Sequence, residues 1–313
     1  MDTATLDPPS TPTSAEQRIN RLNSASVRRP IEPDSALPWG TLGTGALLPD
    51  DLLSIAGLDV STTAEQRARL SREEVASMLT MGVRFEAVLM SGFARMIGEA
   101  PDLTDARVVY MLHEVGEETK HSRAFIRLIA ELDPQTRNPL DRPLLNRIMN
   151  RVTHRITAHD TMLMVMTLAG EEIPDLLQKL AADHPDTDPM LAALNRYHRQ
   201  EEARHLSFAR SVLPEAWARA SRRERAAVKF VAPGLILMLW QNFVHPGVYA
   251  AAGLPTWSTW NAVQKLPRRV ELRHEAIRPV LATLIDAGAI RRGRVPRPWR
   301  ALCGVDASGK PLD

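Results

Sequence analysis

Two short segments decide the fold of this chain: "HRQEEARH" at residues 198–205 and "EETKH" at residues 117–121. Both contain the pattern Glu-Glu-x-(Lys/Arg)-His. Each lies in a stretch whose apolar residues recur every three or four positions, which is typical of a helix packed on one side. The repeat therefore predicts two helices that carry the same acidic and imidazole groups.

The spacing within each motif directs these groups to one side of its helix. Residues three or four apart share a helix face, so Glu118 lies beside His121, and Glu202 lies beside His205. His198 precedes Glu202 by four residues and joins the same stripe. Each helix can thus present a carboxylate oxygen and an imidazole nitrogen to one point.

A four-helix di-iron carboxylate site requires a Glu-x-x-His from each of two helices and one Glu from each of the other two. Glu86 in "VRFEAVLM" meets this requirement, because it is the only acidic residue between Glu74 and Glu99 and apolar residues surround it. A carboxylate in such surroundings is unfavourable unless it is paired or bound to a cation. Glu86 is therefore a candidate metal ligand.

The remaining helix contains "MLMVMTLAGEEIPD", in which Glu171 and Glu172 follow a strongly apolar run. Glu86 precedes Glu118 by 32 residues, whereas Glu171 and Glu172 precede Glu202 by 31 and 30. The closer match favours Glu171, and Glu172 stays open as the alternative.

No segment alternates with period two for long enough to build a sheet. The sequence instead predicts an all-α fold, a ferritin-like long four-helix bundle with additional helices. Capping boxes are predicted at Ser71 with Glu74 and at Ser221 with Glu224. The sequence becomes helical from about 60, and the first long helix is expected to open at the capping box of Ser71 and to end before Pro101. The other expected helices run from about 105 to 132, 144 to 180 with a kink at Pro174, 189 to 211, from 221 onward, and 269 to 287.

The chain divides by composition into three parts. Residues 1–38 are rich in Pro, Ser, Thr and Arg and are expected to form a flexible N-terminal arm, in which "SAEQRINRLNSA" can make a short helix. Residues 39–290 are expected to form the di-iron helical domain. Residues 291–313 begin with "RRGRVPRPWR" and are interpreted mainly as a solvated, irregular tail, with packing on the body or on a partner subunit as the alternative.

Composition limits the partners and the location. The formal charge of +2 indicates no nucleic-acid partner. The single cysteine, Cys303, excludes an internal disulfide and favours a reducing cytoplasm. The first residues, "MDTATLDPPSTPTS", do not resemble a signal peptide. The apolar run at 230–240 is too short to span a bilayer and is interpreted as a buried helix, so no membrane association is expected.

The donor set favours iron over zinc, because four carboxylates and two or three imidazoles without a thiolate are hard and borderline ligands. Manganese or a mixed manganese-iron pair stays chemically open. The neighbouring Glu117 and Glu201 are interpreted as solvated partners of lysines and arginines, which is also open for Glu114, and His113 can pair with Glu117. The alternative for the whole constellation is a chance arrangement on surface helices of an interaction protein.

With these motifs, residues 60–250 resemble the ferritin-like di-iron oxygenases, and the added His198 resembles the arylamine N-oxygenases of the p-aminobenzoate N-oxygenase family. The resemblance implies a site of two irons. Its implied ligands are Glu86, Glu118 and His121 for one iron, and Glu171, His198, Glu202 and His205 for the other. Which carboxylates bridge the irons is left open.

The resemblance also implies an activity. A reduced di-iron site would react with O2, the co-substrate, to give a peroxo-bridged diferric species that oxidises an amine towards hydroxylamine, nitroso or nitro products. It implies an external electron donor, such as a reductase, and a homodimer. Whether the amine arrives free or on a carrier protein is open. Alternatives are a di-iron carbon hydroxylase or desaturase, and an iron-binding ferroxidase without an organic substrate.

Residues that would line a substrate pocket are less visible. Met162, Met164 and Met166 are interpreted as core. Tyr197 is expected to point away from the stripe that holds His198, which argues against a radical role for it. Since only 5% of residues are aromatic, mainly aliphatic pocket walls are expected.

Overall fold

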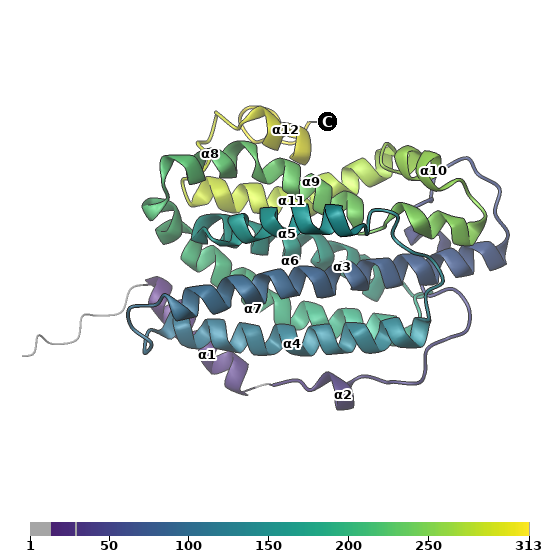
Figure 1. Cartoon of the computed structure of the whole chain (residues 1–313), viewed down its shortest axis with the longest axis horizontal. Coiled ribbons are helices and arrows are strands. Elements are labelled where there is room, and N and C mark those ends of the chain that lie inside the picture. Colours follow the sequence, from purple (N-terminus) through teal and green to yellow (C-terminus); the bar gives the residue numbers. More distant parts are fainter. Residues whose placement is uncertain (1–13, 29, 313) are drawn as a thin grey trace, which may run out of the picture.

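Four long helices form the centre of the molecule (Figure 1). The structure is a computed structural model that describes residues 14–28 and 30–312. The long helices pack chiefly as two consecutive pairs, the first with the second and the third with the fourth. They are α3 (Ala64–Gly98), α4 (Ala106–Leu132), α6 (Asp160–Asp183) and α7 (Pro189–Arg219). No strand occurs in the described residues, and the predicted all-α, ferritin-like fold is confirmed.

Helix α3 begins earlier than the predicted capping box. Thr63 caps it: the Thr63 hydroxyl accepts from the Gln66 amide at 3.2 Å, and the Gln66 side chain accepts from the Thr63 amide at 2.8 Å. The capping role predicted for Ser71 is wrong, because Ser71 lies inside the helix. Its hydroxyl accepts from the amides of Leu47 and Leu48 at 2.8 and 2.7 Å, which fixes the preceding loop against α3.

The single helix predicted from 144 to 180 is also wrong. The chain forms α5 (Pro143–Thr157) and then α6, separated by a break at which His159 is extended, with φ −121° and ψ 119°. Arg95 on α3 stabilises both sides of the break. Its Nε donates to the Thr157 carbonyl at 3.1 Å, and its guanidinium pairs with Asp160 at 2.6 Å. Pro174 lies within α6.

The chain after α7 covers one side of the bundle (Figure 1). Helix α8 (Arg222–Phe230) starts at the predicted cap, where the Ser221 hydroxyl accepts from the Glu224 amide at 3.2 Å. The Glu224 side chain accepts from the Thr161 amide instead of completing the box. Helices α9 (Ala232–Asn242) and α11 (Pro267–Asp286) correspond to the predicted buried run and sixth helix. The shorter elements are α2 (Pro33–Ala36), η1 (Asp50–Leu52), η2 (Pro246–Ala252) and α10 (Thr256–Val263).

Both ends of the described chain pack on the body. Helix α1 (Ser14–Arg28) lies against α4, where Ile19 is buried and the Asn23 amide donates to the Ala106 carbonyl at 2.9 Å. The loose attachment expected for 1–38 therefore does not hold for residues 14–28 and 30–38, and residues 1–13 and 29 lie outside the described part.

The solvated interpretation of the C-terminal segment is wrong. Residues 297–303 form α12 (Arg297–Cys303), which packs on α8, α9 and α11. Trp299 is fully buried, and its indole N–H donates to the Val228 carbonyl at 3.0 Å. Val295, Trp299 and Leu302 are buried together, so the apolar residues of this arginine-rich segment determine its position.

A layer of charged residues crosses the bundle between two hydrophobic clusters. On α3, Leu79 belongs to one cluster and Leu89 to the other, with Glu86 between them. On α7, Leu194 and Leu206 flank the "HRQEEARH" segment in the same way. Near this layer the Phe85 ring of α3 packs directly on Gly170 of α6, where an added Cβ would overlap it.

No single helix of the described chain is both long and apolar enough to cross a membrane. A pair of segments, Arg222–Phe230 and Ala232–Ala252, passes that test of length and composition only when joined, and it is bent by 42°.

Candidate metal centre

The structure brings all seven predicted ligands together. They come from all four long helices, and each is buried, with at most 4% of its surface exposed. We call this set the donor cluster: Glu86, Glu118, His121, Glu171, His198, Glu202 and His205. Donor atoms within 4.8 Å of one another form four groups, which are Glu86–His121–His198, Glu118–His121–Glu202, Glu171–His198–Glu202 and Glu114–Glu118–His205.

Glu202 lies at the centre of the cluster. Its Oε1 is 3.1 Å from His121 Nδ1 and 3.2 Å from His198 Nε2, and its Oε2 is 2.8 Å from His205 Nδ1. Glu118 lies between the same outer imidazoles, with one oxygen 3.4 Å from His121 Nδ1 and the other 3.4 Å from His205 Nδ1. Each of these two carboxylates therefore approaches both His121 and His205.

Two helices each contribute one glutamate without a histidine: α3 contributes Glu86, and α6 contributes Glu171. Glu86 on α3 has one oxygen 3.6 Å from His198 Nε2, and its other oxygen accepts from the Ser122 hydroxyl. Glu171 on α6 reaches His198 and Glu202. Glu172 accepts a hydrogen bond from Arg210 and is in none of the four groups, so the structure places Glu171 and not Glu172 among the donors.

His198 lies near both metal positions. It was assigned by resemblance to the iron of Glu171, and it does share a group with Glu171 and Glu202. It also shares a group with Glu86 and His121, and its ring centroid is 4.5 Å from that of His121. The third imidazole thus sits between the two sides of the cluster.

The first glutamate of each motif supports the histidine of the other helix. Glu201 Oε2 lies 2.9 Å from His121 Nε2, and Glu117 Oε2 lies 2.9 Å from His205 Nε2. Because a carboxylate only accepts, both Nε2 atoms carry the hydrogen, and both Nδ1 atoms face the cluster. The predicted solvation of Glu117 and Glu201 is wrong: they are 7% and 1% exposed.

Arg204 joins these two outer carboxylates. Its guanidinium is 2.8 Å from Glu117 and 3.3 Å from Glu201. Burial alone would raise the pKa of Glu117, but the hydrogen bond from His205 and the charge of Arg204 lower that pKa to about 2. The third imidazole is oriented differently: His198 Nδ1 lies 3.0 Å from Gln178 Oε1, which leaves Nε2 facing the cluster. Such partners fix ring orientation at metal sites.

Sequence reasoning missed these supporting residues. The first Glu of the doubled Glu-Glu carried the signal, since a ligand alone would need only Glu-x-x-His. Gln178 gave no signal, because its role depends on where α6 meets α7. Tyr197 is in none of the donor groups; it is buried in a hydrophobic cluster, and its ring meets His121 of α4 edge-on at 5.5 Å.

The cluster requires a cation. Nδ1 of His121 and of His205 faces carboxylate oxygens while Nε2 holds the hydrogen, so acceptors meet acceptors unless a proton or metal lies between them. Glu86 Oε1, Glu118 Oε1 and Glu202 Oε1 are buried and have no hydrogen bond within the described chain. Burial and the neighbouring Glu202 and Glu118 raise the pKa of Glu171 well above its ordinary value. Four carboxylates and three imidazoles therefore fit a pair of divalent ions.

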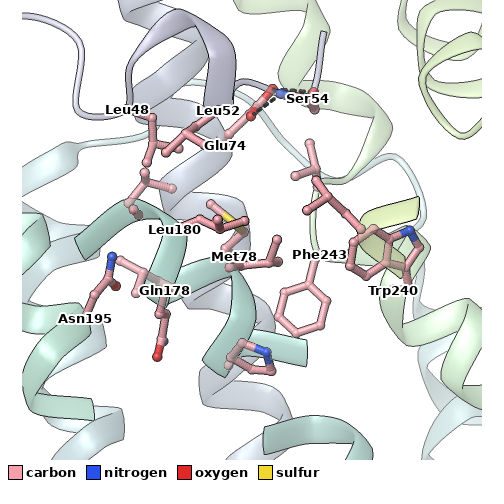
Figure 2. Close-up of a pocket in the computed structure, with 18 of the residues that line it drawn as sticks. Leu48, Leu52, Ser54, Glu74, Met78, Gln178, Leu180, Asn195, Trp240 and Phe243 are labelled. Carbon is pink, nitrogen blue, oxygen red and sulfur yellow. Dashed lines mark hydrogen bonds between the residues drawn. The ribbon is translucent and has the colours of Figure 1, made fainter. Parts of the chain in front are cut away.

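A cavity of about 130 Å³ borders the cluster and includes Glu86, Glu171 and His198 in its lining. Figure 2 shows Glu74 hydrogen-bonded to Ser54, with apolar side chains such as Met78 between this pair and the rest of the cavity. Glu74 precedes Glu86 by 12 residues on α3, so the lining extends along about 18 Å of that helix.

The cavity walls are mainly aliphatic, and they also contain four aromatic side chains, Phe85, Phe125, Trp240 and Phe243. Met162 and Met164 are buried in the core and Met166 packs against it, as predicted, and none of the three lines this cavity.

The core of this helical bundle holds paired Glu-x-x-His motifs and two further buried glutamates. These features define a candidate di-iron carboxylate protein. The model of the family described as p-aminobenzoate N-oxygenase AurF matches residues 12–288, and the chain belongs to this family. The family implies an oxygenase that uses iron.

Two mycobacterial proteins are also similar to this chain. They are the uncharacterized protein Mb0909 of Mycobacterium bovis (strain ATCC BAA-935 / AF2122/97) and the uncharacterized protein Rv0885 of Mycobacterium tuberculosis (strain ATCC 25618 / H37Rv). Each is 25% identical over 243 residues, which cover 74% of this chain and 69% of the relative.

Proposed function

We propose that this protein is a non-haem di-iron monooxygenase that transfers oxygen from O2 to an amine, giving N-oxygenated products towards hydroxylamine, nitroso or nitro. The observation that carries the proposal is the contact between the donor cluster and a largely apolar cavity. Glu86, Glu171 and His198 belong to both. A substrate in the cavity would lie beside the metal site.

The proposed ligands divide between two irons. Glu86 and His121 would hold one, and Glu171, His198 and His205 the other, with Glu118 and Glu202 between them. When bound, the iron pair supplies the redox chemistry that activates O2, with electrons from an external donor such as a reductase.

The chain's own residues prepare the site for this chemistry. Glu117, Glu201 and Gln178 hold the three imidazoles with one nitrogen towards the cluster. The apolar walls, among them Met78 and Phe243, exclude water from a bound substrate and favour an amine with an apolar body. A ferroxidase without an organic substrate has no use for such a cavity, which supports the oxygenase.

The remaining partners and the location are proposed from the resemblance and from the composition. We propose a cytoplasmic homodimer that receives its amine either free or on a carrier protein. Neither nucleic acid nor membrane is part of the proposal.

The test begins with metal analysis of protein loaded with Fe²⁺ under anaerobic conditions, followed by O2 and a reductant in the presence of aryl and alkyl amines. About two irons per chain and an amine product heavier by oxygen atoms derived from ¹⁸O2 support the proposal. Two irons with oxygen inserted only at carbon would identify the hydroxylase alternative. Iron uptake and O2 consumption without any organic product would identify a ferroxidase.

A further inference from the structure

Glu114 on α4 is a buried carboxyl group that the proposed ligand set does not use. It is 0% exposed, and neither of its side-chain oxygens has a hydrogen bond within the described chain. A buried carboxyl group without any partner is strongly unfavourable, so a proton or a metal must compensate it. Its surroundings indicate which.

Unpartnered carboxylate oxygens occur almost nowhere else in the described part of the molecule. The other buried ones belong to Glu86, Glu118 and Glu202, which are all members of the donor cluster. Buried acidic residues outside the cluster instead accept hydrogen bonds; these are Glu73, Glu74, Glu117, Glu172, Asp188 and Glu201. Glu114 therefore shares the property that marks the proposed ligands.

Its position also agrees with a role as a donor. One oxygen of Glu114 lies within 4.8 Å of donor atoms of both Glu118 and His205. Glu114 precedes Glu118 by four residues, just as His198 precedes Glu202. The two positions are equivalent in the two motifs, so Glu114 stands on α4 where the additional histidine stands on α7.

From these observations we infer that Glu114 is an eighth ligand of the metal centre, donating a carboxylate oxygen to the ion held by Glu118 and His205. This inference rests on the proposed two-metal site. Glu114 does not line the cavity, whereas Glu86, Glu171 and His198 do.

The test compares Glu114→Gln with wild type in anaerobic titrations of the full-length apo-protein with Co²⁺, whose visible absorption reports the number of ligands. Glutamine keeps the shape of the side chain and replaces a protonated acid without a change of charge. We expect Glu114→Gln to bind one of two equivalents about tenfold more weakly or worse, with a changed visible spectrum for that ion. Glu73→Gln, at a buried carboxyl group of α3 that belongs neither to the cluster nor to the cavity lining, is the matched control and should bind both ions as wild type does.

Wild-type affinity and spectrum in Glu114→Gln would overturn the inference, because they would identify Glu114 as a buried protonated acid. A crystal structure of the metal-loaded wild type decides the question even if the variant does not fold: a bond from Glu114 to metal supports the inference, and its absence refutes it. If wild type itself binds no metal, the proposed function fails as well, so the two failures are distinguishable.

Discussion

The two Glu-Glu-x-x-His motifs have the same supporting geometry but different surroundings. Aligned on their histidines, they place in equivalent positions Glu114 and His198, Glu117 and Glu201, Glu118 and Glu202, Lys120 and Arg204, and His121 and His205. The glutamate pairs and histidines repeat the same contacts, each outer glutamate holding the histidine of the opposite helix at 2.9 Å. The matched residues build the donor cluster and its support, and two of the unmatched positions, Glu114 with His198 and Lys120 with Arg204, make its surroundings different.

The first difference distinguishes the two sides of the metal centre. Four residues before the second glutamate of the motif, α7 has His198, which lines the cavity, and α4 has Glu114, which does not. The second difference lies outside the centre. Arg204 joins both outer glutamates, whereas Lys120 donates to the Ile31 carbonyl at 3.0 Å. The two helices therefore differ at the cavity, which His198 reaches and Glu114 does not.

The largest expected effect comes from removing the shared carboxylates. Glu202→Ala should lose both metal ions, because Glu202 approaches three imidazoles at 2.8 to 3.2 Å. Glu118→Ala should lose at least one, since Glu118 approaches two imidazoles at 3.4 Å. Elemental analysis after anaerobic Fe²⁺ loading measures both. Full occupancy in either variant would show that the carboxylate concerned is not a ligand.

The single acidic residues offer a matched pair of adjacent positions. Glu171→Ala should lose metal, because Glu171 lies within reach of His198 and Glu202. Glu172→Ala should retain about as much metal as wild type, since it loses only a partly exposed ion pair with Arg210. Metal content per chain decides between them, and the reverse result would identify Glu172 as the ligand from α6.

Much of this comparison was predictable from the sequence, because helical periodicity alone aligns Glu118 with His121 and Glu202 with His205. Isolation in an apolar stretch identified Glu86. The crossed contacts of Glu117 and Glu201 were not predictable in the same way. They depend on the packing of α4 against α7, and a glutamate on a helix looks solvated until the neighbouring helix is placed.

The errors in the fold have a similar origin. The break between α5 and α6 is stabilised by Arg95, which lies on another helix. Ser71 has the spacing of a cap, yet its hydroxyl binds a loop from 24 residues earlier in the chain. The C-terminal segment contains many arginines, but the burial of Trp299 decides its position. In each case the local sequence pattern predicted one structure, and a contact with residues distant in the chain determines another.

Replacement of His198, which is equivalent to Glu114 in the other motif, should change the metal content less. His198→Ala should retain much of the iron, since His121 and His205 remain with the carboxylates. It should lose turnover or shorten the transient visible absorption that follows O2 addition, because His198 is the imidazole that faces the cavity. Stopped-flow spectroscopy and product analysis measure this. Unchanged iron, absorption and turnover together would remove His198 from the site.

The smallest expected effect concerns the second unmatched position, where Arg204 and Lys120 can be compared directly. Arg204→Gln removes the cation that joins Glu117 and Glu201, so both outer carboxylates lose a partner and hold the imidazoles less firmly. Loss of such an outer contact weakens metal binding about tenfold. Lys120→Gln removes only a hydrogen bond to the Ile31 carbonyl and should leave the affinity for Co²⁺ unchanged. Titration of both variants measures the difference. Equal affinities would mean that the crossed glutamates orient the histidines without Arg204, and that the asymmetry of the centre lies entirely at Glu114 and His198.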